Sequence, residues 1–228
     1  MESRLVTTRQ LRDWRRFREE NGDLDFHILT APERDAYMEE SWGGSELHQL
    51  YLSAALGVVK ADIFRYAIVF DRGGYYCDAN KGVFSKLSSY TDSQQTGLVS
   101  FESNDALVFP SAVSLHEIMR PHKLVLQWAF GFAPKHRLLE RVISRIEENG
   151  HLFQGQIFEV PKNAVLQFSS AGMFTQVFRE YAEEVGLAEI SQIDVDFEKT
   201  GVFRLDGVRV VEKHFGHYSE LRDSKILA

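Results

Sequence analysis

Residues 60–80 read KADIFRYAIVFDRGGYYCDAN, and this stretch decides the fold. An apolar residue recurs every three or four positions between Ile63 and Phe70, which predicts a helix with one apolar stripe. Gly73 and Gly74 follow the last of these positions, where helices commonly end on a left-handed residue that glycine adopts at low cost. We therefore expect a helix that ends near residue 72 and a break in the chain at the two glycines.

The residues after the glycines predict a short strand that ends on side chains able to bind a metal. Residues 75–77 are two tyrosines and a cysteine, which are typical of strands. Asp78 and Asn80 lie two positions apart, so both would project to the same side at the carboxyl end of that strand. Their oxygens are the ligands that hard divalent cations prefer. The sequence therefore predicts a metal site beside the helix.

Asp62 and Arg65 lie three positions apart and share one face of the predicted helix. An exposed pair of this kind contributes only about 0.2–0.5 kcal/mol to helix stability. The alternative is that the pair binds a ligand, because its face would point toward the strand tip with Asp78 and Asn80. We favour the second interpretation.

Together these residues resemble a known family. The pattern Ala-Asp-x-x-Arg-Tyr at residues 61–66, followed by Gly-Gly-x-Tyr-x-Asp-x-Asn at residues 73–80, is similar to the DXD-containing sugar-binding region of GT-A glycosyltransferases. The likeness is greatest to the Och1-like and capsular-polysaccharide transferases and the glucosylating bacterial toxins. It implies an α/β fold: a single GT-A-like domain over residues 1–228, with a mostly parallel central sheet flanked by helices. The family's first strand, which helps to hold the nucleotide base, is not recognisable: either the domain lacks it, or other parts of the chain hold the base.

The resemblance also implies a function. It is the metal-dependent transfer of a sugar from a UDP- or GDP-sugar donor to a glycan, lipid-linked or protein acceptor, with retention of anomeric configuration. Asp62 and Arg65 would hold the hydroxyls of the donor sugar, and Tyr76 would line the donor site. Asp78 would touch the ribose and the metal, Mn²⁺ or Mg²⁺. Asn80 stands where the family has a second aspartate, so one negative charge is missing and weaker metal affinity is expected.

Further members of the predicted site lie in the carboxyl-terminal half. Ser170 and Gly172 stand where the family often has a glycine-proline turn over the donor. His214 and His217 stand where many GT-A enzymes place a residue that completes the metal and diphosphate site; the alternative is that these two histidines pack or face solvent. His136 matches a histidine of the family in a loop that precedes a helix.

Composition restricts the class of protein. The chain has 228 residues, 44% hydrophobic and 26% charged, as in soluble globular proteins. A net charge of −7 leaves no excess of lysine and arginine to neutralise phosphates, which argues against nonspecific nucleic-acid binding. No stretch reaches the length of a membrane span and the amino terminus has no apolar leader, so we expect a cytoplasmic location without an integral membrane segment. Cys77 is the one cysteine and cannot form an internal disulfide.

Periodicity and turn residues predict the remaining elements. Helices are expected at residues 11–20, from 31, at 47–56, at 138–148 and from 174. Strands are expected at residues 24–29, 98–101 and 106–109, and in a hairpin at 202–211. Residues 127–137 are expected to form a strand and then a loop, and a further strand is expected to end at residue 168.

Two other functions remain open at this point. In the first, the chain is a non-catalytic nucleotide-sugar or glycan binding module, a pseudoenzyme in which Asn80 marks lost turnover. In the second, it modifies a protein side chain as the toxins do. A donor-hydrolysis assay separates an enzyme from a binding module.

Overall fold

A computed structural model describes residues 8–78, 81–83, 85–103, 110–198, 202–204 and 218–228. The elements follow in chain order: α1 (Thr8–Glu20), α2 (Ala31–Trp42), α3 (Glu46–Ser53), α4 (Gly57–Arg72), β1 (Gly74–Cys77), β2 (Lys81–Val83), the 3-10 helix η1 (Leu87–Tyr90), β3 (Gly97–Val99), α5 (Ala112–Glu117), β4 (Ala129–Phe132), α6 (Arg137–Phe153), α7 (Pro161–Phe168), α8 (Ala171–Glu184), β5 (Ile190–Gln192), α9 (Val195–Glu198), β6 (Val202–Arg204) and η2 (Tyr218–Glu220).

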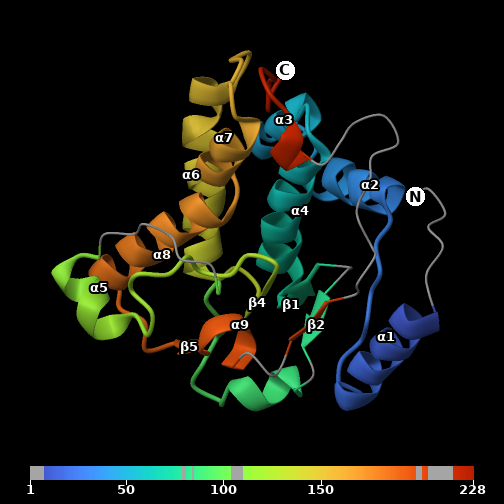
Figure 1. The fold of residues 1–228 in the computed structure, drawn as a ribbon, viewed down its shortest axis with the longest axis vertical. Coiled ribbons are helices and arrows are strands. Elements are labelled where there is room, and N and C mark those ends of the chain that lie inside the picture. Colours follow the sequence, from blue (N-terminus) through green and yellow to red (C-terminus); the bar gives the residue numbers. More distant parts are fainter. Residues whose placement is uncertain (1–7, 79–80, 84, 104–109, 199–201, 205–217) are drawn as a thin grey trace.

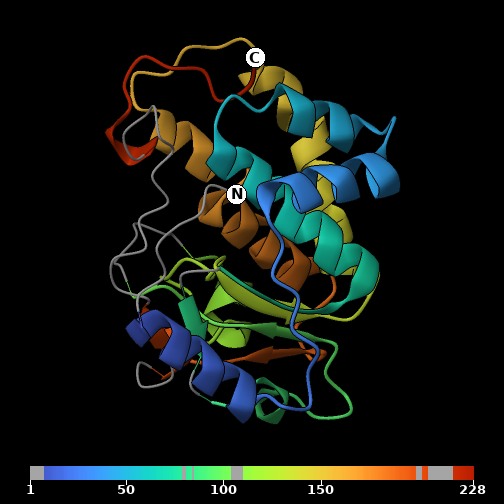
Figure 2. The same cartoon turned by 90° about the vertical axis from the view of Figure 1, so that its right-hand side faces the viewer.

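A mixed sheet lies between a thick helical layer and a thinner one (Figures 1 and 2). On one side, α4, α6 and α8 bury the larger hydrophobic cluster, which includes Ile63, Phe130 and Phe174. On the other side, Phe17 of α1 packs in a smaller cluster with Leu98 and other residues of the sheet. The architecture is therefore α/β. No described helix is both long and apolar enough to cross a membrane.

The sheet has the strand order β1-β4-β3-β5, and the expectation of a mostly parallel sheet is wrong. β4 is antiparallel to both β1 and β3, and β3 is parallel to β5. The cause is that the chain before β4 runs back alongside the end of β3: Leu126 N donates to Ser100 O at 2.8 Å, and Glu102 N donates to Leu124 O at 2.9 Å. β4 therefore enters the sheet in the opposite direction. β1, β3 and β5 still share a direction, so their carboxyl ends meet at one edge.

The helix-glycine-strand unit forms as predicted. α4 ends at Arg72, and Gly73 follows with φ of 69°, its N–H donating to Val69 O at 2.9 Å. β1 then pairs with β4, where Gly131 lies opposite Tyr75. A Cβ atom on Gly131 would lie 2.4 Å from Cδ1 of Tyr75, so the pairing of these strands requires a glycine there.

Two further expectations are wrong. Residues 24–29 form no strand; Leu24 and Phe26 instead pack beside α1, where the rings of Phe26 and Phe17 meet edge to face at 5.2 Å. Phe168 ends helix α7 rather than a strand, because Ala164, Val165 and Phe168 form one buried helical face. The predicted strand at 106–109 lies outside the described residues.

The predicted hairpin at 202–211 is described in part. Its first strand, β6, is antiparallel to β2, with Gly82 opposite Phe203. Its second strand lies outside the described residues, so the hairpin itself stays a prediction.

His136 caps the amino terminus of α6, and its cap requires the neutral imidazole. Nδ1 accepts a hydrogen bond from Leu138 N at 3.1 Å, which the protonated ring could not do. Burial lowers the pKa of His136, although the nearby Glu189 carboxylate acts in the opposite direction.

This cap predicts a pH dependence of stability. Because the folded-state pKa of His136 lies below the unfolded value of about 6.5, the unfolded state binds the proton more readily. The stabilisation is complete above that pH and is lost as pH falls below it, with a slope of at most about 1.4 kcal/mol per pH unit. His136→Asn keeps a capping acceptor that does not titrate in this range. The free energies of unfolding of the two proteins, measured in urea from pH 7.5 to 5, should therefore converge as pH falls; a constant difference would contradict this role.

Candidate functional site

Helix α4 carries Asp62 and Arg65 inside the molecule. The helix is buried on most of its circumference, because α3, α6, β1 and β4 all contact it. Asp62 is 1% exposed and Arg65 5% exposed, and Arg65 Nη2 lies 3.1 Å from Asp62 Oδ1. The pair is therefore not the exposed helix pair that spacing alone permits. A buried ion pair requires close partners for both charges.

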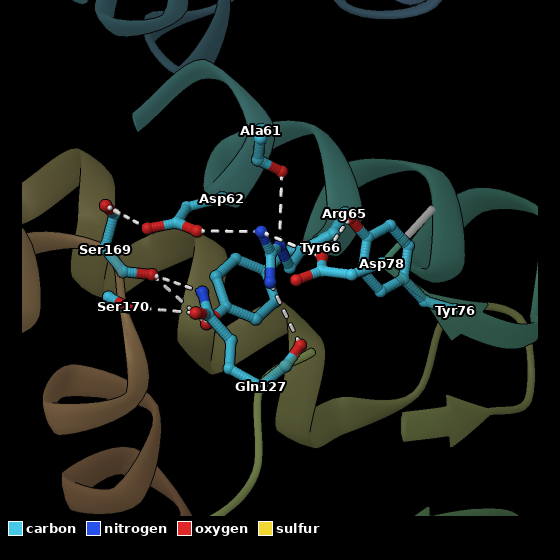
Figure 3. Close-up of polar contacts among 9 residues, drawn as sticks. All are labelled: Ala61, Asp62, Arg65, Tyr66, Tyr76, Asp78, Gln127, Ser169 and Ser170. Atoms are coloured by element: carbon cyan, nitrogen blue, oxygen red, sulfur yellow. Dashed lines mark hydrogen bonds and ion pairs between the residues drawn. The ribbon is translucent and has the colours of Figure 1, made fainter. Parts of the chain in front are cut away.

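Arg65 uses most of its donors within the protein (Figure 3). Nε donates to Ala61 O at 3.3 Å, and Nη1 donates to Gln127 O at 3.1 Å. Nη2 also lies 3.5 Å from Asp78 Oδ1, and the guanidinium carbon lies 4.9 Å from the centre of the Tyr76 ring. Burial opposes the positive charge, but the surrounding tyrosine and two carboxylates outweigh it and raise the pKa of Arg65.

Asp62 is a buried carboxylate whose two oxygens have different partners. Ser169 Oγ donates to Oδ2 at 2.9 Å. Oδ1 faces Arg65 but accepts no hydrogen bond of good geometry among the described residues. Burial raises the pKa of Asp62 to about 7, against the lowering effects of Arg65 and Ser169. Oδ1 therefore has an ionic contact with Arg65 but lacks a hydrogen bond from any described residue, which is costly for a buried acceptor.

Asp78 brings the cluster to the protein surface. It follows β1 directly, and its N–H donates to Trp128 O at 2.8 Å, which fixes the backbone against the segment before β4. The Tyr76 hydroxyl donates to Asp78 Oδ1 at 2.9 Å. The Asp78 side chain is 29% exposed, so a ligand in solvent can reach it.

Gln127, Tyr66 and Ser169, which the sequence did not assign to the site, support it together with Ser170. Gln127 Nε2 donates to the Tyr66 hydroxyl at 2.8 Å and to Ser169 O at 3.0 Å. Ser170 Oγ donates to Gln127 Oε1 at 2.9 Å. The available signal was a glutamine between apolar residues at the start of a predicted strand, since a buried polar residue requires partners.

The structure thus brings together Asp62, Arg65, Tyr76 and Asp78, and it connects Ser170 to them through Gln127. Gly172 lies in the first turn of α8, where a Cβ atom would be 2.7 Å from Leu166 O. Close packing of α7 and α8 explains a glycine there, and its role in donor binding stays a prediction.

The other predicted metal ligands, Asn80, His214 and His217, lie outside the described residues. Tyr218 is described, and it packs against the larger core cluster. Burial, and then the charge of Asp62, raises the pKa of Tyr218. The chain directly after His217 is therefore within electrostatic reach of the site.

The described residues offer one member of the predicted metal set, Asp78. Its carboxylate is an oxygen ligand of the kind that Mn²⁺ and Mg²⁺ take, and its partial exposure allows a cation to approach. Within the described ranges, no group of three histidine, cysteine, aspartate or glutamate side chains could hold a metal.

Two of three comparisons with known proteins find glycosyltransferases. No model of a protein family matches the chain. An initiation-specific alpha-1,6-mannosyltransferase of Schizosaccharomyces pombe is 22% identical over 163 residues, which cover 68% of this chain and 40% of the relative. The solved PaToxG glycosyltransferase matches with a TM-score of 0.52 and 13% identity, over 81% of this chain and 66% of that one.

The chain is similar to glycosyltransferases in sequence and in fold. The structural match confirms the predicted α/β glycosyltransferase-like fold, with a mixed sheet. The chain spans about two fifths of the mannosyltransferase and just under two thirds of the PaToxG chain.

The burial of the ion pair predicts a large and non-additive effect on stability. Arg65→Met should destabilise the protein by about 3–5 kcal/mol, because it leaves the Asp62 carboxylate buried without its cation. The double variant Asp62→Asn/Arg65→Met should cost clearly less than the sum of the single changes. Urea denaturation measures all three variants.

The matched control is Arg120→Met, which removes an exposed pair with Asp194 and should cost much less. Equal losses at Arg65 and Arg120, or strict additivity of the double variant, would contradict the buried pair.

Proposed function

We propose that the chain is a glycosyltransferase that moves a sugar from a nucleotide-sugar donor to an acceptor. One observation carries the proposal: a buried Asp62–Arg65 pair that contacts Asp78 at the carboxyl end of β1, in a chain similar to glycosyltransferases. Ligands of open α/β sheets bind at the carboxyl ends of strands. β1, β3 and β5 share that end here, and the cluster lies at it.

The cluster suits the hydroxyl groups of a sugar. Asp62 Oδ1 is a buried acceptor without a hydrogen bond among the described residues, and a sugar hydroxyl would supply the missing donor. Arg65 keeps Asp62 and Asp78 close together by neutralising part of their charge. In this proposal Asp62 and Arg65 orient the donor sugar, and Asp78 meets the donor where the site opens to solvent.

Asp78, Asn80, His214 and His217 would hold a divalent cation, Mn²⁺ or Mg²⁺. A bound cation supplies charge neutralisation at the donor diphosphate, which makes the nucleotide a better leaving group. The amide of Asn80 offers a neutral oxygen, so it should bind the cation less strongly than an aspartate would.

The transfer itself exchanges one bond for another at the anomeric carbon. The bond from C1 to the diphosphate oxygen breaks with its electron pair, and a bond from C1 to the acceptor oxygen forms. The proton of the acceptor hydroxyl passes to the departing diphosphate. We propose attack on the face that the nucleotide leaves, which retains the anomeric configuration. The acceptor would be a glycan, a lipid-linked sugar or a protein.

Asp78 gives the first test of this function. Asp78→Ala should lower Mn²⁺-dependent hydrolysis of the donor by about a hundredfold or more, because it removes a proposed metal ligand at the diphosphate. Release of UDP or GDP is measured with UDP-glucose, UDP-N-acetylglucosamine and GDP-mannose. Asp25→Ala, at an exposed position between α1 and α2, is the control and should not change the rate. Unchanged hydrolysis in Asp78→Ala would contradict the site, and donor binding by the wild type without any turnover would favour a binding module.

Asn80 gives the second test. Asn80→Asp should tighten Mn²⁺ binding by roughly tenfold, about 1.4 kcal/mol, because it adds a negative charge to the ligand set. Calorimetric titration of Mn²⁺ into wild type, Asn80→Asp and Asn80→Ala measures the order of affinities. No gain from the aspartate and no loss from the alanine would remove Asn80 from the metal site.

A further inference from the structure

Gln127 lies where three parts of the candidate site meet. It precedes β4 and is 5% exposed. Its neighbours fix its backbone to two strands: Leu126 N donates to Ser100 O beyond β3, and Trp128 O accepts from Asp78 N beyond β1, both at 2.8 Å. Leu126 and Trp128 point into the smaller cluster on one side of the sheet. The Gln127 side chain points to the other side, toward α4 and the α7–α8 turn (Figure 3).

The amide of Gln127 has both of its donors in use. Nε2 donates to the Tyr66 hydroxyl and to Ser169 O, and Oε1 accepts from Ser170 Oγ. A primary amide has two N–H groups, so neither is left for a ligand. Gln127 is therefore not equipped to donate to the sugar.

Both members of the ion pair nevertheless depend on Gln127. Its main-chain carbonyl oxygen accepts from Arg65 Nη1 at 3.1 Å. Its amide holds the carbonyl of Ser169, whose hydroxyl donates to Asp62 at 2.9 Å. Tyr66 on α4 also donates to that carbonyl at 3.1 Å, so one glutamine connects α4, β4 and the α7–α8 turn.

We propose that Gln127 is a positioning residue of the donor site. Its side chain sets the orientation of Asp62 toward the sugar through Ser169, and its main-chain carbonyl holds Arg65, without either group contacting the sugar itself. This proposal rests on the proposed function, since it assigns the sugar to the Asp62–Arg65 pair. Glutamine is the residue type that the contacts require. A glutamate would place an acceptor oxygen against the Ser169 carbonyl, and a leucine would leave the Ser170 hydroxyl without its acceptor.

The test compares binding of a nucleotide sugar with binding of the nucleotide alone. Dissociation constants for UDP-glucose, UDP-N-acetylglucosamine and GDP-mannose, and for UDP and GDP, are measured by calorimetry with Mn²⁺. In Gln127→Leu the nucleotide sugar that the wild type binds should bind about tenfold more weakly, while the matching nucleoside diphosphate should bind unchanged. A general loss of structure would weaken both ligands together.

Gln192→Leu is the matched control. It removes both hydrogen bonds of a glutamine side chain, one from Met119 N and one to Glu117 O, each at 2.8 Å, at β5, away from the cluster. The control should bind both kinds of ligand as the wild type does. Equal binding of the nucleotide sugar by Gln127→Leu and Gln192→Leu would overturn the proposal.

A second measurement separates this proposal from the proposed function. The hydroxyl proton of Ser169 donates to Asp62 Oδ2 within the buried cluster, and its exchange with solvent can be followed by NMR without any ligand. Gln127→Leu should accelerate this exchange at least about tenfold, and Gln192→Leu should not. Failure of the wild type to bind any nucleotide sugar would contradict the proposed function, whereas unchanged exchange in Gln127→Leu would contradict the positioning role by itself.

Discussion

The buried guanidinium of Arg65 is the charge on which the rest of the site depends. At 5% exposure it requires compensation from its neighbours, and Asp62, Asp78 and the Gln127 carbonyl supply it from three different segments. The turn at Gly73 lets β1 run along α4, so that the chain can return Asp78 to Arg65. A mutual requirement for charge compensation thus fixes α4, β1 and the segment before β4 relative to one another.

The same cluster combines a cost in stability with a capacity to bind. Hydrophobic residues of similar volume often replace a buried ion pair without loss of stability, so stability alone does not explain Asp62 and Arg65. The cost is accounted for if Asp62 Oδ1, which has no hydrogen bond among the described residues, receives one from a ligand. The PaToxG glycosyltransferase has a similar fold at 13% identity, and a fold by itself does not determine function. The proposed function therefore rests on these side chains.

The sequence predicted the part of the site that is local in the chain. The helix, the glycine break and the strand follow one another, so their spacing alone placed Asp62, Arg65 and Asp78 together. It did not predict Ser169, which is 107 positions from Asp62, or Gln127, which is 62 positions from Arg65, because nothing local specifies these pairings. The prediction of a mostly parallel sheet was wrong for the same reason. The direction of β4 depends on how residues 124–128 run back beside the end of β3.

The central claim is that the Asp62–Arg65–Asp78 cluster binds the sugar of a nucleotide sugar. The most direct test is a crystal structure of the protein soaked with Mn²⁺ and, in turn, UDP-glucose, UDP-N-acetylglucosamine and GDP-mannose. The account predicts a sugar hydroxyl within hydrogen-bond distance of Asp62 Oδ1 and the diphosphate beside Asp78. A nucleotide sugar bound elsewhere, or with its sugar turned away from Asp62 and Arg65, would contradict it.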